Sequence, residues 1–485
     1  MTGEAIVKFT WNNQTVSANT GDSVAAALYR AGIISIAKTR KLHEPMGYSG
    51  SFITGVLARV DGRPNVRLDQ ELAKEGMRVE SQNRWPSASF DLLKLARFLP
   101  PTWVYGGFEH GRFAPSQGKA YLLWERLLAN LAGVGEPPSR DAVSGERKAA
   151  KVIVDTLVVG GGPEGQKAAN DAAARGASVA LVTRGQTLGR YAVAMGGALN
   201  KLHESVQVFS GMELFGSYRG GTLMVAAPTR HDQGAVAFEA SKLVLATGKR
   251  SMPPMVYGNH LPGVMDAHTA LLLSHFHGVQ PGKTIAVIGS GEEKKVADRL
   301  SHLGARITYC GAASDLTRIH GSSRVTAIDV GKCIKCDAVV HVGPWHRDPS
   351  LEFQSRAEGR LQVSDVLIDA NIEVVGFAST ADDKIHVPER LDPRTRICPC
   401  MDVTAGELVG LIKGGETDPE VLKRLTSCGM GPCQGLPCWE SMLALLASLT
   451  GRSVDDFMRP SHRAPRRSIT VAQAAGLCDV VDVLR

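Results

Sequence analysis

The sequence predicts an α/β protein with two nested units of parallel strands and helices. A buried strand, a glycine-rich turn and a helix follow one another from Val152, and the same order starts again at Thr284. Five of the nine cysteines lie between Cys398 and Cys438, which predicts a separate small domain near the end of the chain. A length of 485 residues is enough for about three domains of ordinary size.

Composition excludes several classes of protein. With 44% hydrophobic residues the chain can bury real cores, and a net charge of +7 is too mild to indicate a nucleic-acid partner. No run reaches about 18 apolar residues, and the N-terminus lacks the order of a secretory signal. We therefore expect a cytoplasmic chain with no transmembrane segment.

Patterning predicts the order of the domains. Short alternating runs with a helical stretch near Val24–Ala31 predict a small sheet with one helix. The next segment is rich in proline breaks and carries one amphipathic helical pattern near Ala120–Leu131, as expected of a wrapping linker. The predicted units are a small domain at 1–80, the linker at 81–150, a first nucleotide-binding unit at 151–250 and 360–390, an inserted second unit at 251–359, and a cysteine-rich domain at 391–485.

The first glycine turn has the pattern of a dinucleotide-binding motif. Gly160, Gly162 and Gly165 separate a buried strand from a helix, which permits a tight turn, close approach of a pyrophosphate and close helix packing. An acidic residue is expected at the end of the second strand, but Arg184 stands there. Arg184 is either a phosphate ligand on the ribose or a solvated side chain.

Two later segments bear on the same site. Gly248 and Arg250 follow a strand at residue 245. This segment resembles the strand and turn that return beside the flavin nucleotide in flavoproteins with two dinucleotide domains. The alternative is an ordinary strand end. Phe377 occupies the place, after Gly376, where such proteins offer an aspartate for the ribityl chain. FAD is therefore one candidate ligand of the first unit, with ATP or NAD(P) as the alternatives.

The second glycine turn departs from the motif. Gly289 and Gly291 are followed by Glu292, Glu293 and Lys294, so the third glycine is missing. Two carboxylates at the helix N-terminus oppose an anionic pyrophosphate. We expect a dinucleotide fold that has lost nicotinamide cofactor binding.

The cysteine spacing predicts a metal centre. Cys398 and Cys400 form one close pair, and Cys433 and Cys438 form another. Two pairs of thiolates suit a [2Fe-2S] cluster, whose two irons each take two cysteines. Structural zinc is the alternative, although the single residue between Cys398 and Cys400 is shorter than zinc pairs usually have.

The remaining candidates have simpler interpretations. Cys428 is interpreted as a packing residue beside the second pair. Cys333 and Cys336 have the spacing of a redox pair, but no helix start is evident there to lower a thiol pKa. His43 and His346 are isolated histidines, and no catalytic residue is identified in the chain.

With these motifs in place, the chain resembles the alpha subunits of heteromeric flavin-dependent amine and amino-acid oxidoreductases. These are the subunits of sarcosine oxidase, opine oxidase, dye-linked proline or hydroxyproline dehydrogenase and hydrogen cyanide synthase. The resemblance rests on residues 60–67, residues 82–87, the first glycine turn, residues 337–345 and the four cysteines Cys398, Cys400, Cys433 and Cys438. Pro344 is a departure within the fourth of these segments.

The resemblance implies a fold for the terminal domains. It implies a β-grasp, ferredoxin-like domain at the N-terminus and a small helical iron–sulfur domain like bacterioferritin-associated ferredoxin at the C-terminus. Residues 41–60 contain no cysteine, so the N-terminal domain is expected to hold no cluster. The chain also ends without the folate-binding half of the sarcosine oxidase subunit, so transfer of a methylene group to folate is not expected.

The resemblance also implies a function. The amine is expected to be oxidised in a beta subunit that carries FAD, while this chain relays electrons through the [2Fe-2S] cluster. The resemblance allows FMN at the interface with that partner, a small additional subunit, and an electron acceptor at the inner membrane. The alternatives are a self-sufficient NAD(P)H-dependent flavoprotein reductase and a non-enzymatic scaffold subunit.

Overall fold

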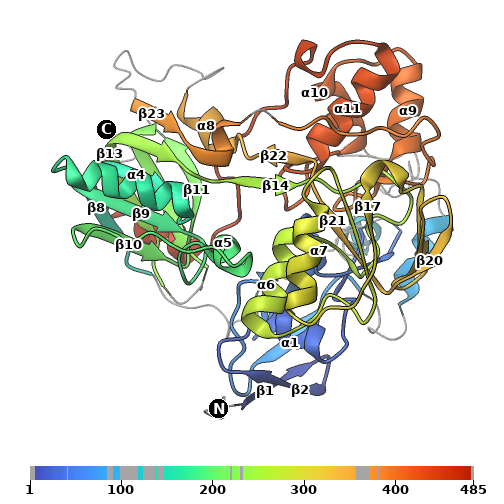
Figure 1. Ribbon diagram of the computed structural model, residues 1–485, viewed down its shortest axis with the longest axis horizontal. Helices are drawn as coiled ribbons and strands as arrows, with labels where there is room; N and C mark the ends of the chain where they lie inside the picture. The colour runs from blue at the N-terminus through green and yellow to red at the C-terminus, as the bar shows by residue number, and fades with distance from the viewer. Residues whose placement is uncertain are drawn as a thin grey trace.

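The computed structural model describes residues 6–40, 42–84, 91–98, 118–123, 138, 147–218, 221–229, 233–356, 371–380 and 382–481. Most of the predicted linker therefore lies outside the described residues, as do Trp85 to Ser87 and residues 360–370. Of the helix expected at Ala120–Leu131, only helical residues up to 123 are described. Figure 1 shows the chain folded into several mixed layers, and the α/β class predicted from the sequence is confirmed.

The N-terminal domain is a five-stranded sheet packed on one helix. The helix begins at Val24 because the Ser23 hydroxyl accepts a hydrogen bond from the Ala26 backbone N–H, and its alanine-rich face is buried under the sheet. The sheet has the strand order β2-β1-β7-β5-β6. Its elements, with a small accessory hairpin and two 3₁₀ turns, are β1 Ile6–Trp11, β2 Gln14–Asn19, α1 Val24–Arg30, β3 Ala37–Lys38, β4 Pro45–Met46, η1 Ile53–Val56, β5 Leu57–Val60, β6 Arg63–Arg67, β7 Arg78–Ser81 and η2 Leu92–Phe98.

The first nucleotide-binding unit is a seven-stranded sheet. Its parallel strands β10, β9, β8 and β13 carry the glycine turn at one edge, and β23 also pairs with β13 in parallel. A buried apolar run at the end of β8 explains why this strand lies in the middle of the sheet. The elements are β8 Ala150–Val159, α4 Pro163–Ala174, β9 Val179–Thr183, α5 Arg190–Ala194, β10 Val206–Ser210, β11 Met212–Tyr218, β12 Leu223–Pro228, β13 Val236–Leu245 and β23 Asn371–Val374.

The second unit is inserted between β13 and β23. Its four parallel strands have the order β15-β21-β16-β17, and a separate three-stranded antiparallel sheet, β18-β19-β20, is inserted between β17 and β21 in the chain. The elements are β14 Lys249–Ser251, β15 Val264–Asp266, α6 Ala267–His277, β16 Ile285–Gly289, α7 Glu293–His302, β17 Ile307–Ala312, η5 Ala313–Asp315, β18 Arg318–Gly321, β19 Val325–Asp329, β20 Cys333–Lys335, β21 Ala338–Val342, β22 Trp345–Arg347 and α8 Ser350–Ser355. Strands β14 and β22 pair with each other and connect the two units.

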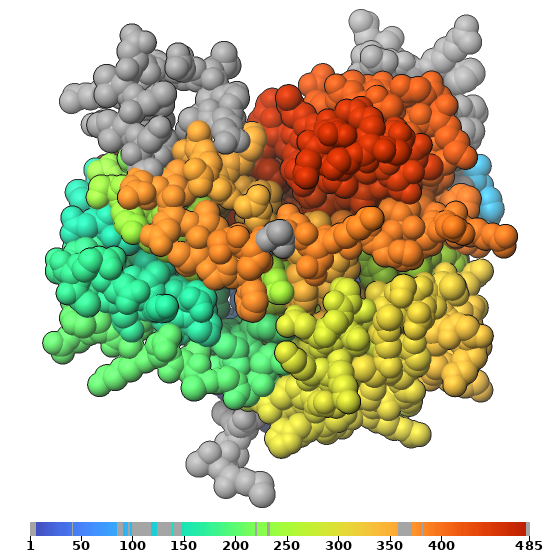
Figure 2. Space-filling model, turned by 45° about the horizontal axis from the view of Figure 1, so that its top comes forward, coloured from blue at the N-terminus to red at the C-terminus, as the bar shows by residue number. Residues whose placement is uncertain are grey.

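The C-terminal domain is a small helical domain with its own core. The 3₁₀ turn η6 Gly376–Ser379 precedes the domain. The elements of the domain itself are β24 Arg396–Cys398, β25 Val403–Thr404, α9 Ala405–Lys413, α10 Pro419–Thr426, α11 Cys438–Thr450, η7 Val454–Asp456 and α12 Val471–Cys478. Helix α11 is buried from Cys438 to Leu446 and forms the centre of this core. In Figure 2 the orange segment after β23 passes over the junction between the green first unit and the yellow second unit before it joins this domain.

Candidate functional site

Five buried thiols gather in the C-terminal domain. Their side chains are at most 2% exposed: Cys398, Cys400, Cys428, Cys433 and Cys438. The sulfur atoms of Cys398, Cys428 and Cys438 all lie within 4.8 Å of one another, and those of Cys400 and Cys433 are 3.4 Å apart. The four cysteines predicted as metal ligands are therefore close together, and a fifth thiol joins them.

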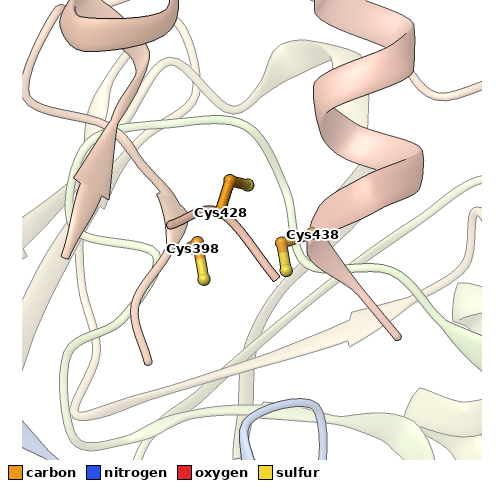
Figure 3. Close-up of side chains that lie close together, drawn as sticks. All are labelled: Cys398, Cys428 and Cys438. Carbon is orange, nitrogen blue, oxygen red and sulfur yellow. The ribbon is translucent and has the colours of Figure 1, made fainter. Parts of the chain in front are cut away.

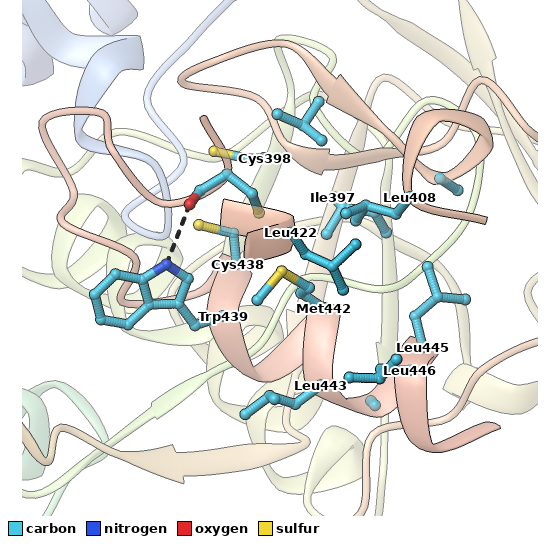
Figure 4. Packing of buried hydrophobic residues seen from close by; sticks show 14 of the residues in the cluster. Ile397, Cys398, Leu408, Leu422, Cys438, Trp439, Met442, Leu443, Leu445 and Leu446 are labelled. Atoms are coloured by element: carbon cyan, nitrogen blue, oxygen red, sulfur yellow. Dashed lines mark hydrogen bonds between the residues drawn. The ribbon is translucent and has the colours of Figure 1, made fainter. Parts of the chain in front are cut away.

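The loop before α11 is held in place by one aromatic side chain. Gly429 and Gly435 have φ of +78°, and a Cβ on either would come within 1.8 or 2.2 Å of the Trp439 indole. The Trp439 indole N–H donates a hydrogen bond of 3.2 Å to the Cys428 carbonyl, drawn as the dashed line in Figure 4. The two glycines thus let the loop that carries Cys428 and Cys433 wrap closely around a buried ring.

Helix caps on either side set the ends of this loop. Asp418 caps α10, with Pro419 at the first helical position, as the sequence predicts. The helix stops at Ser427, which has a φ of +63°. Helix α11 begins at Cys438, where the positive end of the helix dipole favours a thiolate. Hydrogen bonds with Cys398 and Cys428, together with burial, nevertheless raise the pKa of Cys438 well above its ordinary value.

The thiols differ in their acidity. Hydrogen bonds from the thiols of Cys428 and Cys438, with further ones from backbone N–H groups, hold the pKa of Cys398 well below its ordinary value despite burial. The hydrogen bond between Cys400 and Cys433, together with burial, raises the pKa of Cys400. A metal must displace the protons of such thiols when it binds.

Arg250 is a partly buried cation whose charge interacts with Cys433. It lies on β14, and the neighbouring charges include Asp348, Glu440 and Cys433. Burial lowers the pKa of Arg250, and its Nε has no hydrogen-bond partner among the described residues. The sequence interpretation assigned Arg250 to the nucleotide, and that assignment stays a prediction; in the structure the charge of Arg250 also interacts with Cys433.

This donor set fits an anionic iron–sulfur cluster. Four thiolates match the two cysteines that each of two irons takes, and the partly buried Arg250 guanidinium would reduce the net negative charge of such a group. The compact trio of Cys398, Cys428 and Cys438 also matches what zinc prefers, so both alternatives from the sequence remain chemically open.

Cys428 is the residue whose place the sequence interpretation did not foresee. It is packed in the core of the domain, as expected, and its sulfur also lies against those of two proposed ligands, Cys398 and Cys438. Figure 3 shows the side chains of Cys398 and Cys438 pointing in a similar direction and that of Cys428 pointing elsewhere. Its spacing was an available signal, because four residues separate Cys428 from Cys433 and four separate Cys433 from Cys438.

The first glycine turn has the geometry that the motif predicts. Gly160 has a φ of +117°, and a Cβ there would lie 2.1 Å from the Ala246 carbonyl oxygen; a Cβ on Gly165 would lie 1.9 Å from the Gly160 oxygen. A Cβ on Gly162, which caps α4, would meet nothing within 4 Å. The turn is therefore tight where it must be and open where a ligand would approach.

Two further residues assigned to this site border it. Gly248, with a φ of +71°, ends the run after β13. Arg184 follows β9 and is exposed, which leaves both of its interpretations open.

The second glycine turn is occupied by the protein's own carboxylate. The Gly291 backbone N–H donates a hydrogen bond of 2.7 Å to Glu293 Oε2. A backbone N–H at this position would otherwise face a pyrophosphate. The contact supports the interpretation that this unit has lost nicotinamide cofactor binding.

The junction between the units holds Lys249 between two aromatic rings. Its ammonium lies 4.4 Å from the centre of the Phe377 ring and 4.8 Å from that of Trp345. Glu292 from the second turn is 3.9 Å away. Phe377, which replaces the expected aspartate, thus packs over a cation rather than offering an acceptor to a ribityl chain.

The other candidates do not join these sites. Cys336 is buried in the core of the second unit, where burial raises its pKa to about 12, whereas Cys333 is exposed. His43 contacts Asp91 at 3.2 Å, and His346 contacts the Asp383 carbonyl at 2.8 Å. Neither histidine lies among the cysteines that gather in the described structure.

Comparison with protein families matches two segments of the chain. Residues 4–84 match the 2Fe-2S iron-sulfur cluster binding domain, and residues 154–327 match the pyridine nucleotide-disulphide oxidoreductase domain. These families indicate two classes of cofactor, a [2Fe-2S] cluster and a flavin with a nucleotide. Residues 4–84 contain no cysteine, however, so thiolates for a cluster can come only from Cys310 onward.

Curated relatives agree with the resemblance. The alpha subunit of sarcosine oxidase from Rhizobium meliloti is 29% identical over 317 residues, which cover 59% of this chain and 32% of the relative. One of the subunits of opine oxidase from the same organism is 35% identical over 82 residues, which cover 17% of this chain and 18% of the relative. The chain is homologous to these two proteins. The matches span about a third and about a fifth of the relatives' lengths.

A solved structure matches the whole fold. L-proline dehydrogenase from P. horikoshii superposes with a TM-score of 0.73 over 97% of this chain and 98% of that chain, at 19% identity. At this identity the likeness establishes the fold alone. Among the described residues, no helix is both long and apolar enough to cross a membrane.

Proposed function

We propose that the chain is the electron-transfer alpha subunit of a heteromeric, flavin-dependent amine or imino-acid dehydrogenase or oxidase. The observation that carries the proposal is that Cys398, Cys400, Cys433 and Cys438 are all buried and gather in one small domain. A [2Fe-2S] cluster held by these four residues would accept and pass on one electron at a time. The homology to two oxidase subunits supports a role in amine oxidation.

The division of labour between subunits is part of the proposal. The substrate, such as an opine, proline or hydroxyproline, is oxidised on a partner beta subunit that holds FAD. The first unit of this chain holds FAD, ATP or NAD(P) at Gly160, Gly162, Gly165 and Gly248, with Arg184 at the ribose. FMN at the subunit interface is compatible with this arrangement, as is an acceptor at the inner membrane for a complex in the cytoplasm.

Metal analysis of anaerobically purified full-length protein tests the cluster. The proposal expects about two irons and two labile sulfides per chain, with an electron paramagnetic resonance signal after reduction. The Cys398→Ser variant, which lacks one of the four proposed ligands, is the comparison for the wild type. Zinc in place of iron, or neither iron nor sulfide, contradicts the proposal.

Co-expression with an FAD-containing oxidase-like subunit tests the relay. The complex is expected to reduce a dye in the presence of an amine or imino acid, and the Cys398→Ser complex is expected to oxidise substrate with far slower dye reduction. Equal dye reduction by both complexes would show that electrons do not pass through the thiol site.

One observation bears on the alternative of a self-sufficient NAD(P)H-dependent reductase. Glu293 occupies the amide that a pyrophosphate would need in the second turn. The electron-transfer proposal therefore expects that NADH and NADPH do not bleach any flavin in the isolated chain. Bleaching would favour the reductase.

A further inference from the structure

A second group of metal-binding side chains lies on the small antiparallel sheet of the second unit. His320 on β18, Asp329 at the end of β19 and Cys333 at the start of β20 place one ligand atom each within 4.8 Å of the others. The group is separate from the buried thiols and plays no part in the proposed electron transfer.

The register of the three strands explains why these side chains meet. Asp329 pairs directly with Cys333, and His320 pairs with Ala327, two residues before Asp329. Directly paired residues and residues two apart share one face of a sheet, so all three side chains project from the same side. The site is therefore built on paired strands rather than on a loose loop.

Backbone contacts hold two of the three residues. The Thr317 N–H and hydroxyl both donate to the Asp329 carbonyl, at 2.9 and 3.2 Å, and the Thr326 hydroxyl donates to the His320 carbonyl at 3.2 Å. Asp329 and His320 already contact each other at 2.7 Å between Oδ2 and Nε2. Donor atoms around a tetrahedral zinc ion are separated by about 3.3 to 3.6 Å. A small increase in the distance between Asp329 Oδ2 and His320 Nε2 would therefore make room for the ion.

We propose that His320, Asp329 and Cys333 bind a zinc ion with one coordination position open to solvent. Imidazole, carboxylate and thiolate are the three ligand types that zinc takes in proteins, and each is present once. The site is reachable, because the His320 and Asp329 side chains are 37% and 34% exposed and Cys333 is exposed.

The neighbouring charge does not close the site. Arg318 on β18 pairs directly with Asp329 and shares its face of the sheet, but the Arg318 guanidinium lies over the Tyr257 ring, 4.8 Å from the ring centre. A plain ion pair between His320 and Asp329 explains two of the three side chains without metal. The ion pair gives no role to Cys333. A substitution of Cys333 therefore distinguishes the zinc site from the ion pair.

Zinc titration of the full-length protein tests the proposal. The wild type is expected to bind one zinc equivalent more than the Cys333→Ser or His320→Gln variant. If the variants still bind that equivalent, the wild type is expected to bind it at least about tenfold more tightly. The buried thiols contribute equally to all three proteins, so the comparison isolates this site. Cys478→Ser, which removes another exposed thiol, is the matched control and keeps the full number of equivalents.

Cobalt provides a second readout. Cobalt in place of zinc is expected to give a thiolate-to-metal absorption band that is weaker in Cys333→Ser than in the wild type and unchanged in Cys478→Ser. Equal zinc binding and an unchanged cobalt spectrum in Cys333→Ser and His320→Gln overturn the proposal. Neither result depends on the iron content of the protein, so this proposal and the electron-transfer proposal fail separately.

Discussion

Single residues decide what the cysteine site can hold. Cys433 lies 3.4 Å from Cys400, whereas Cys428 packs against Cys398 and Cys438 but points in another direction. These two cysteines sit in the same loop, are both buried and differ by only five positions in sequence. They therefore form a matched pair for testing which thiols are ligands.

Serine substitutions at Cys433 and at Cys428 are expected to change the iron and labile sulfide content differently. Cys433→Ser should lose most of its iron and labile sulfide, because one iron is left with a single cysteine. Cys428→Ser should keep the cluster, because the four proposed ligands remain. Iron and sulfide analysis with absorption spectra measures both, and equal loss in the two variants would make Cys428 a ligand.

Arg250 is expected to set the reduction potential of that cluster. A positive charge beside the cluster stabilises its more negative reduced form, so Arg250→Gln should lower the potential, by about 60 mV or more if about 1.4 kcal/mol is lost. Arg250→Lys keeps the charge and should shift the potential less. Spectroscopic redox titration measures the shift, and an unchanged potential in Arg250→Gln would contradict this role.

At the scale of the element, the two strand–turn–helix motifs differ in what lies at the helix N-terminus. The first turn is tight at Gly160 and Gly165 and open at Gly162, whereas Glu293 fills the second turn. The same backbone plan thus gives one turn that a nucleotide can approach and one that is self-occupied.

Alanine substitutions in the first turn are expected to separate stability from binding. Gly162→Ala should lose bound nucleotide but cost no more than about 1 kcal/mol of stability, because its φ of −71° and its open surroundings accept a side chain. Gly160→Ala should cost more than about 2 kcal/mol, because a Cβ there meets the Ala246 oxygen at a positive φ.

Thermal unfolding and analysis of nucleotide released on denaturation measure the two effects. Gly410→Ala, a helical position with an open surround, is the control and should leave the nucleotide content unchanged. Nucleotide retained at wild-type levels in Gly162→Ala would show that the first turn is not the binding site.

At the scale of the whole molecule, two carboxylates join the N-terminal domain to the rest of the protein. Glu44 accepts hydrogen bonds from Arg396 of the C-terminal domain and contacts His260 of the second unit at 2.9 Å. Asp22 pairs with Arg30 of its own domain and contacts His277 of the second unit at 2.9 Å.

The Glu44 and Asp22 carboxylates make the packing of the N-terminal domain against the rest of the protein sensitive to acid. Burial alone would raise both pKa values, but hydrogen bonds from His260 and the charge of Arg396 lower the pKa of Glu44 to about 2, and hydrogen bonds from His277 and Arg30 lower that of Asp22 to about 2. Their ordinary values are 4.5 and 3.8. Because the folded-state pKa is depressed, this stabilisation is complete above the ordinary values and is lost as the pH falls towards about 2.

Glu44→Gln is therefore expected to be destabilised at neutral pH and not in acid. The loss should be about 2 kcal/mol near neutrality, because Arg396, with a side chain only 4% exposed, loses its closest charged partner. The difference from the wild type should shrink as the pH falls below about 4.

Chemical denaturation across this pH range measures the difference. Asp392→Asn removes a more exposed ion pair with Arg394 and is the control, with a change within about 0.5 kcal/mol at any pH. A difference for Glu44→Gln that stays constant with pH would contradict the role of its charge.

The sequence by itself determined the features that depend on neighbouring residues. The strand, turn and helix at Gly160 and the Asp418 cap follow from local backbone rules, and the described elements agree with them. The cysteine spacing predicted which thiols gather, but the 3.4 Å contact joins Cys400 to Cys433, across the two predicted pairs. Only the tertiary structure decided which distant groups meet. It placed Cys428 among the proposed ligands and put His320 beside Cys333, because strand register and domain packing join residues that no local pattern connects.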